Sequence, residues 1–201
     1  MDKYRNFAEL SNAEGADAFL VTAHSRHTAA CIIAPHGGSI EPGTSELALA
    51  LAGDKISLYL FEGRKPTNNR DLHITSTNFD EPAGVQIVTS SQYCVAFHGC
   101  AGDDEVVYLG GRDADLKAIL EKHLKELGFV VARHENPELQ GESSRNICNR
   151  GLVKKGVQFE ISRGLRDRLT DTSGRLEAPS LQDFVNATRR SLAEHEEQVS
   201  Q

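Results

Sequence analysis

The sequence predicts one α/β domain, residues 1–201, with a mixed, mostly parallel β-sheet flanked by helices. Two observations predict this fold class. Short apolar runs bounded by glycine, proline or polar residues alternate along the chain with segments of helical periodicity, as is typical of α/β folds. The 201 residues are enough for one hydrophobic core and few for two, and they contain no repeat, low-complexity tract or evident linker.

The first predicted unit is a strand, a glycine-rich loop and a helix. Residues 29–34 (AACIIA) form an apolar run that ends at Pro35, as expected of a buried strand. The glycine-rich loop at residues 36–43 follows. Thr44 has the side chain of a helix N-cap and Gly53 is a stop signal, so we expect a helix between them.

The rest of the chain continues this alternation. Residues 113–127 carry apolar side chains at helical spacing up to a stop signal at Gly128. Further strands are expected at residues 55–62, 94–97, 105–109, 129–132 and 157–161, and a polar helix at residues 181–199. Ligands of such sheets bind beyond the carboxyl ends of the strands, so we expect a functional site there.

The composition restricts the functional class. The formal net charge of −7, from 22 Lys and Arg against 29 Asp and Glu, argues against a nucleic-acid-binding protein. No run approaches the roughly 18 apolar residues that span a bilayer, and the polar N-terminal stretch has no secretory signal. We therefore expect cytoplasmic synthesis, with release by cell lysis still open, and no membrane partner. We also expect a monomer, because no exposed apolar stripe requires a second copy.

The four cysteines show no C-x-x-C pair and no even framework, so we expect them to be reduced. Cys148 stays open as a nucleophile, although no histidine that could activate it lies beside it in the sequence.

Residues 145–168 are strongly basic within this acidic chain. They contain seven Lys or Arg residues against Glu160 and Asp167, a local balance of +5. One interpretation is a solvated basic face, and the other is a wall that binds an anionic ligand.

Two of the predicted strands end in His-Gly, at His36 and His98, and a third strand carries Glu160. Glycine after a ligand lets the backbone turn sharply and lets an ion or a substrate come close. A catalytic zinc ion takes three protein ligands, often two histidines and a carboxylate, and Glu41 lies in the loop after His36. From the residues alone, a zinc site and a pair of hydrogen-bonded histidines at strand ends are about equally open.

Five sequence blocks are similar to the signature of one known family. They are APHGGSIEPGTSE at residues 34–46, LHITST at 72–77, FHG at 97–99, NICNRG at 146–151 and GVQFE at 156–160. In this order they resemble the phage-type poly-γ-glutamate hydrolases, and the resemblance covers most of the chain.

By this resemblance His36, Glu41 and His98 hold a zinc ion and Glu160 is the general base. The family is similar to the zinc carboxypeptidases in its core, which implies an α/β fold with a metal at the sheet edge. Zinc carboxypeptidases place the first histidine and glutamate three residues apart, whereas the spacing here is five. This difference leaves Glu46 as a rival third ligand, which we rank below Glu41 because Glu46 lies in the first turn of the predicted helix.

The reaction implied is hydrolysis of γ-glutamyl amide bonds in poly-γ-glutamate by a metal-activated water. Arg150 is expected to stabilise the oxyanion or to bind a substrate carboxylate. Every residue of the polymer carries an α-carboxylate, so an acidic enzyme needs a locally basic groove to bind it. The candidate substrate-binding residues are His73, Arg145, Asn149 and Arg163. For His73, a satisfied histidine on a strand is an equal alternative.

Two other functions remain open at this point. A zinc peptidase or amidase of the same architecture that acts on peptidoglycan or other peptides would need the same zinc, water and base. A phosphate- or nucleotide-binding module is a more remote alternative, since backbone amides at a helix N-terminus favour anions. The chain has neither G-x-x-x-x-G-K-[ST] nor G-x-G-x-x-G, and a phosphate loop has no use for His36.

Overall fold

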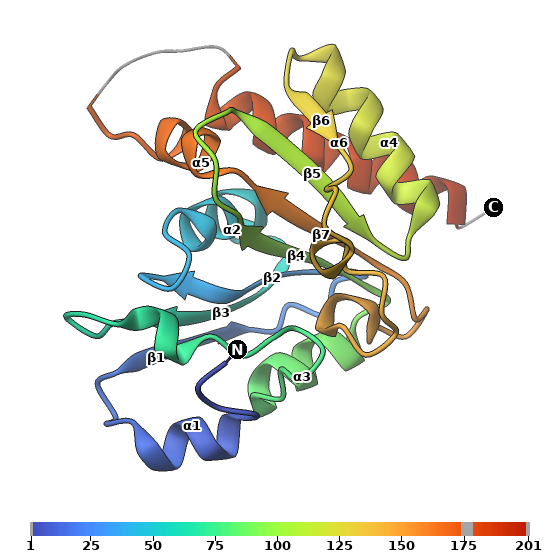
Figure 1. The fold of residues 1–201 in the computed structure, drawn as a ribbon. Coiled ribbons are helices and arrows are strands. Elements are labelled where there is room, and N and C mark those ends of the chain that lie inside the picture. Colours follow the sequence, from blue (N-terminus) through green and yellow to red (C-terminus); the bar gives the residue numbers. More distant parts are fainter. Residues whose placement is uncertain (1, 174–178, 200–201) are drawn as a thin grey trace.

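A mixed β-sheet forms the centre of the computed structural model, which describes residues 2–173 and 179–199 (Figure 1). The strands are β1 (Phe19–His24), β2 (Ala30–Gly38), β3 (Ser57–Gly63), β4 (Tyr93–Gly99), β5 (Val106–Gly111), β6 (Val130–Ala132) and β7 (Gly156–Ile161). Within the described residues they form one seven-stranded sheet in the order β1-β3-β2-β4-β7-β5-β6. The β1/β3 and β5/β7 pairs are antiparallel and the other neighbours are parallel, which confirms the predicted sheet.

Helices cover both faces of this sheet (Figure 1). The α-helices are α1 (Phe7–Ala13), α2 (Thr44–Ala52), α3 (Pro82–Ser90), α4 (Ala114–Glu126), α5 (Arg163–Leu169) and α6 (Leu181–Val199), and short 3₁₀ helices occupy Asn69–Leu72, Pro137–Leu139 and Ile147–Asn149. Helices α2, α4, α5 and α6 pack on one face, and α1 and α3 pack on the other. The sequence predicted α2, α4 and α6, but not β1, α1, α3 or α5.

The central strand β2 shows why the sheet needs both layers. Ile32 and Ala34 belong to the core beneath α2 and α6, whereas Cys31 and Ile33 belong to the core beneath α1 and α3. All four side chains are fully buried. A parallel strand that is covered on both faces reads as a continuous apolar run, which is the pattern at this position of the sequence.

Strand β2 does not end at Pro35 as predicted. It continues to Gly38, and its register against β3 shifts between Ala34 and Gly37. Proline lacks a backbone N–H but is tolerated in a strand at such an irregularity, where no ladder hydrogen bond is lost. The extension carries His36 to the carboxyl edge of the sheet.

The predicted N-cap of α2 is also wrong by one residue. The cap is Gly43, whose φ of 96° lies in the left-handed region, and Thr44 is the first residue of the helix. The hydroxyl of Thr44 donates instead to the backbone carbonyl of Glu41 at 2.8 Å. The loop before α2 is therefore closed by its own hydrogen bonds.

The segment before α1 is tied to the fold by the carboxylate of Glu14. Its Oε1 accepts hydrogen bonds from the Tyr4 hydroxyl at 2.6 Å, from Lys65 at 3.0 Å and from Lys3 at 3.2 Å. Lys3 also contacts Asp71 at 3.1 Å. These contacts hold residues 2–4 against the loop that follows β3.

Glu14→Gln is expected to destabilise the protein at neutral pH and to matter less in acid. The Tyr4 hydroxyl above all, together with Lys65 and Lys3, outweighs burial and lowers the pKa of Glu14 from 4.5 to about 2. The ionised carboxylate thus stabilises the folded state above pH 4.5, and this contribution is lost as the pH falls towards 2. The free energies of unfolding of wild type and variant should therefore differ most at neutral pH and converge as the pH falls from 4.5 towards 2. A gap that stays constant with pH contradicts this account.

Candidate metal centre

The two histidines at the ends of β2 and β4 face each other at one edge of the sheet. Strands β2 and β4 are parallel neighbours, so their carboxyl ends lie at the same edge. The Nδ1 atoms of His36 and His98 are 3.1 Å apart, and the two residues are only 1% and 3% exposed. The sheet topology thus brings together two imidazole nitrogens from positions far apart in the sequence.

The carboxylate of Glu41 completes this cluster from the loop between β2 and α2. The backbone N–H of Glu41 donates to the carbonyl of His36 at 3.0 Å, which folds the loop back over the end of β2. Its Oε1 lies 3.4 Å from His36 Nδ1, and its Oε2 lies 3.7 Å from His98 Nδ1. Oε2 also accepts a hydrogen bond from the N–H of Gly99 at 2.9 Å.

Glu41 is ionised in this setting. Burial raises the pKa of its carboxyl, but His36 and His98 lower this pKa by a larger amount, so the net pKa is well below 4.5. The rival Glu46 lies on the exposed face of α2 and is not part of the cluster. The geometry therefore favours Glu41 as the third ligand, at the longer of the two possible spacings from His36.

The donor set fits a metal ion. His36 Nε2 is 2.8 Å from the carbonyl of Ile74, which can only accept, so Nε2 carries a hydrogen and Nδ1 is the ring nitrogen that faces His98 and Glu41. One ligand atom from each of the three residues lies within 4.8 Å of the others. Ligands held about 2.0–2.1 Å from a tetrahedral zinc lie about 3.3 Å apart, close to the separations found here. Two nitrogens and one carboxylate could hold a zinc ion and leave a further position open.

Glu160 lies on β7, directly beside the strand that carries His98. The two residues are register partners in the parallel β4/β7 pair, and Glu160 is 5% exposed. The side-chain amide of Gln158 donates to its Oε1 at 2.9 Å. Burial, with a smaller effect of the nearby Glu41 carboxylate, raises the pKa of Glu160 to about 8. A carboxyl group with such a pKa can both take and give a proton near neutral pH.

His73 also reaches the cluster, from the loop after β3. Its ring lies on the ring of His36 with the centroids 3.9 Å apart, and its Nε2 is 3.9 Å from Glu41 Oε1. The other nitrogen, Nδ1, is 2.8 Å from a carboxylate oxygen of Asp2. His36 above all, and then burial, lowers the pKa of His73 to about 4, so this ring is neutral at neutral pH.

Two other predicted site residues are turned towards the backbone. The guanidinium of Arg150 donates to the carbonyls of Arg145, Phe79 and Thr77. Asn149 is 1% exposed, and its amide donates to the carbonyls of two residues in the loop before it, at 2.7 and 2.9 Å. Both side chains hold the loop that leads into β7.

The remaining predicted residues lie on the surface. Arg145 is exposed and donates to Asn78 at 3.0 Å. Arg163 is exposed at the start of α5 and pairs with Asp167 one turn later at 2.6 Å. Cys148, by contrast, is fully buried, and burial raises its pKa to about 12, which disfavours a nucleophilic thiolate.

Sequence reasoning missed Arg166, a buried residue of α5 that is 4% exposed. Its guanidinium donates to the carbonyl of Pro42, to that of Cys100 at 3.0 Å and to that of Ile161 at 3.0 Å. Each of these carbonyls lies one or two residues after a residue of the candidate site, which is Glu41, His98 or Glu160. In the sequence Arg166 is one of seven basic residues in its segment, and nothing marks its partners, because they are main-chain atoms.

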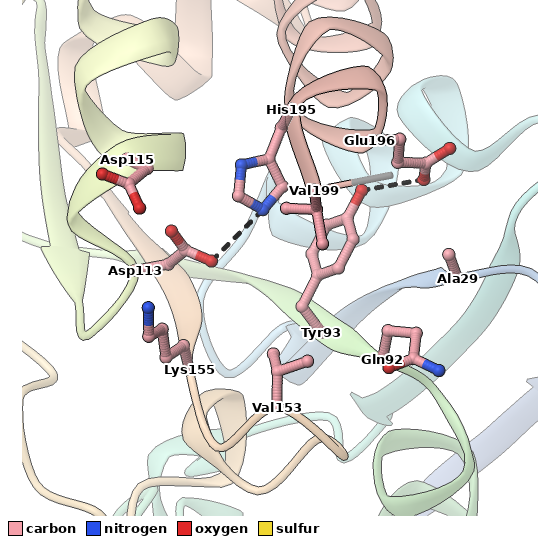
Figure 2. A pocket seen from close by; sticks show the side chains of 10 residues that line it. All are labelled: Ala29, Gln92, Tyr93, Asp113, Asp115, Val153, Lys155, His195, Glu196 and Val199. Carbon is pink, nitrogen blue, oxygen red and sulfur yellow. Dashed lines mark hydrogen bonds and ion pairs between the residues drawn. The ribbon is translucent and has the colours of Figure 1, made fainter. Parts of the chain in front are cut away.

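A pocket of about 410 Å³ lies elsewhere, at the amino-terminal ends of the parallel strands (Figure 2). Four of its side chains form two pairs: His195 Nε2 is 3.4 Å from Asp113 Oδ2, and the Tyr93 hydroxyl donates to Glu196 at 2.8 Å. These pairs tie the end of α6 to the sheet. The pocket is separate from the candidate metal centre, which lies at the opposite ends of β2, β4 and β7.

Comparison with known proteins agrees with the geometry. Residues 4–189 match the family model described as poly-gamma-glutamate hydrolase. The chain belongs to the poly-γ-glutamate hydrolase family. It is 38% identical over 170 residues to the UPF0714 protein YndL of Bacillus subtilis (strain 168), covering 84% of this chain and 67% of YndL. It is also 38% identical over 172 residues to the UPF0714 protein YmaC of the same strain, covering 85% of this chain and 73% of YmaC.

Solved structures place the chain in the same family. A bacteriophage poly-γ-glutamate hydrolase superposes with a TM-score of 0.91 at 31% identity, over 98% of this chain and 100% of that one. A zinc-free apo form of YndL superposes with a TM-score of 0.86 at 34% identity, over 96% and 98% of the two chains. Family and fold together support a hydrolase. None of the described helices of this poly-γ-glutamate hydrolase family member is both long and apolar enough to cross a membrane.

Proposed function

We propose that the protein is a zinc-dependent hydrolase that cleaves γ-glutamyl amide bonds in poly-γ-glutamate. The single observation that carries this proposal is the convergence of His36, Glu41 and His98 beside the buried Glu160, in a chain of the poly-γ-glutamate hydrolase family. The existence of YndL in a form described as zinc-free adds support for zinc as the ion.

In this proposal the two histidines and Glu41 hold the ion. When bound, zinc polarises an amide carbonyl and lowers the pKa of a coordinated water to about 7. From its position on β7 beside His98, Glu160 takes the proton from the attacking water and passes it to the leaving amine. The bond from Gln158 to Oε1 holds the carboxyl group in one orientation during both transfers.

Binding of a polyanion needs cations on the surface, because the chain carries a net charge of −7. We retain Arg145 and Arg163 as candidates for binding substrate carboxylates, since each has only a surface partner to give up. Asn149 and Arg150 would have to break several hydrogen bonds to contact substrate, so we propose that they act by holding their loop. His73 lies close enough to the cluster to contact substrate with Nε2.

Arg166→Met is expected to lower both stability and metal affinity. The substitution removes a guanidinium that donates to three carbonyls flanking the site. The carbonyl of Ile161 keeps the N–H of Cys100 and Pro42 is exposed, so the main cost is the carbonyl of Cys100, at about 1–3 kcal/mol for an unsatisfied buried group. We expect the free energy of unfolding to fall by about 1–3 kcal/mol and the zinc affinity to fall with it. Denaturant titration and chelator competition measure the two quantities.

Arg163→Met on the same helix provides the control for this experiment. Its ion pair with Asp167 is exposed, so its loss should change stability by no more than about 1 kcal/mol and leave zinc affinity unchanged. If the two variants behave alike, Arg166 is not the residue that holds the three loops.

The proposed function is tested by metal content and polymer cleavage on one purified sample. About one zinc per chain, with poly-γ-glutamate shortened on size-exclusion chromatography, is the expected result. Zinc without cleavage would retain a metallohydrolase and move the substrate to peptidoglycan or other peptides. Failure to bind zinc after incubation with it would overturn the proposal.

A further inference from the structure

The loop at residues 73–76 packs against the candidate ligands from outside. The ring of His73 lies on that of His36 at a centroid distance of 3.9 Å, with 34° between the ring planes. The Nε2 of His73 is 3.9 Å from Oε1 of Glu41. A shift of the His73 ring would therefore change the contacts of two of the three candidate ligands, His36 and Glu41.

The next residues of the same loop contact the far sides of both histidines. The carbonyl of Ile74 accepts the Nε2–H of His36 at 2.8 Å, and the hydroxyl of Ser76 is 3.4 Å from Nε2 of His98. Partners of this kind orient a ligating ring and fix which of its nitrogens carries the hydrogen. The loop thus forms the outer layer of the proposed metal site.

This loop is held in place by the carboxylate of Asp2, which precedes α1. Asp2 Oδ2 accepts the backbone N–H of Thr75 at 2.6 Å, and Oδ1 is 2.8 Å from Nδ1 of His73. Burial raises the pKa of Asp2, but the bonds to Thr75 and His73 lower this pKa by a larger amount, so the group is ionised at neutral pH. An ionised carboxylate can only accept, so Nδ1 of His73 carries the hydrogen and the ring is fixed in one tautomer.

Asp2 is itself firmly placed. The next residue, Lys3, contacts Glu14 and Asp71, and Tyr4 is 7% exposed with its hydroxyl bonded to Glu14. The contacts of residues 3 and 4 therefore fix the backbone next to Asp2, and the side chain of Asp2 is only 19% exposed.

We propose that Asp2 is a positioning residue for the metal centre, which acts by clamping residues 73–76 and, through them, the rings of His36 and His98. This inference rests on the proposed function, because it takes these histidines as zinc ligands. The clamp has two bonds with different tasks: one to Thr75 that fixes the loop, and one to His73 that fixes the ring.

Two substitutions separate these tasks. Asp2→Ala removes both bonds and is expected to weaken zinc binding about 10-fold, as loss of an outer partner commonly does. Asp2→Asn keeps an oxygen that can accept from Thr75 but offers no negative charge to His73, so its zinc affinity should fall less than that of Asp2→Ala. At saturating zinc, kcat on poly-γ-glutamate should fall in the same order with little change in KM. If Asp2 fixed only the loop and had no effect on the metal centre, wild type and both variants would have the same zinc affinity, and this result would contradict the proposal.

The matched control is Glu9→Gln, which alters another carboxylate near this end of the fold that bonds Arg5 and contacts neither Asp2 nor residues 73–76. It should leave zinc affinity and kcat as in wild type. The measurements are zinc dissociation constants by chelator competition, kcat and KM, and imidazole NMR spectra of the metal-free proteins.

The outcomes distinguish this inference from the proposed function. Tighter zinc binding by wild type than by Asp2→Asn, and by Asp2→Asn than by Asp2→Ala, is the expected result. Equal zinc affinity and kcat in wild type, Asp2→Asn and Asp2→Ala would overturn the role of Asp2 without affecting the proposal that the protein is a zinc hydrolase. If wild type binds no zinc, the proposed function fails, and the inference for the metal centre fails with it. Unchanged His36 and His73 resonances in metal-free Asp2→Ala would overturn the clamp independently.

Discussion

His98→Ala is expected to lose bound zinc and with it at least about 100-fold of the hydrolytic activity. Outer partners of a metal ligand alone cost about 10–100-fold, and removal of the ligand itself should cost more. His98 is 3% exposed, and its Nδ1 lies 3.1 Å from that of His36, so no other described side chain of the cluster can replace it. Zinc content after dialysis and the rate of poly-γ-glutamate shortening measure the two losses.

The control for this variant is His24→Ala, since His24 is an exposed histidine at the end of the edge strand β1. It should keep both zinc and activity. Circular dichroism shows whether the His98 variant is folded. A folded His98→Ala protein with a full complement of zinc would remove this residue from the ligand set and overturn the site as proposed.

Glu160→Gln is expected to keep its zinc and to lose about 10²–10⁴-fold in kcat. General acid and base groups contribute factors of this size, and glutamine is nearly the same shape but cannot exchange the proton. Glu160 is not part of the cluster that could hold the ion, so metal content should not change. The variant thus separates the chemistry at Glu160 from metal binding.

Single-turnover or steady-state rates on the polymer, with zinc content measured on the same samples, test this expectation. Glu142→Gln is a suitable control, because Glu142 is exposed and pairs only at the surface with Arg133. Retained activity in Glu160→Gln would transfer the base to another group, and His73 would be the next candidate. Loss of zinc would instead make Glu160 a ligand.

The fold was largely readable from apolar patterning, and the exceptions have physical reasons. The apolar runs that became β2, β3, β4, β5 and β7 are largely buried strands and stand out as such, and the edge strand β6, which has only Val131 buried, was predicted as well. Helix α3 was missed because it begins with Pro82 and contains Gly84, both of which read as helix-breaking signals, although proline suits the first helical turn. Helices α1 and α5 are each only seven residues long, too short for periodicity to be decisive.

The candidate site divides in a different way. His36 and His98 could be found as the residues at which two strands end, and the family resemblance added Glu41 and Glu160. Nothing in the sequence marks Asp2, since its role depends on a contact with a loop 71 residues away.

The basic residues of the segment before and after β7 were harder to interpret. Arg150 looked like a substrate-facing cation, yet its donors are used by carbonyls of its own loop and of the loop before α3. Hydrogen bonds to main-chain atoms leave no trace in side-chain patterns. For this reason the sequence could locate the centre but not the groups that hold it together.

The origin of each ligand also determines how the ion would leave. His36 and His98 are carried by interior strands, whose hydrogen bonds open only when the whole domain unfolds. Glu41 and the outer loop at residues 73–76 lie outside the sheet, in segments that can open locally. If the three residues hold an ion as proposed, we expect its dissociation rate to follow local opening of these two loops, and a metal-exchange experiment would measure that opening while the sheet stays folded.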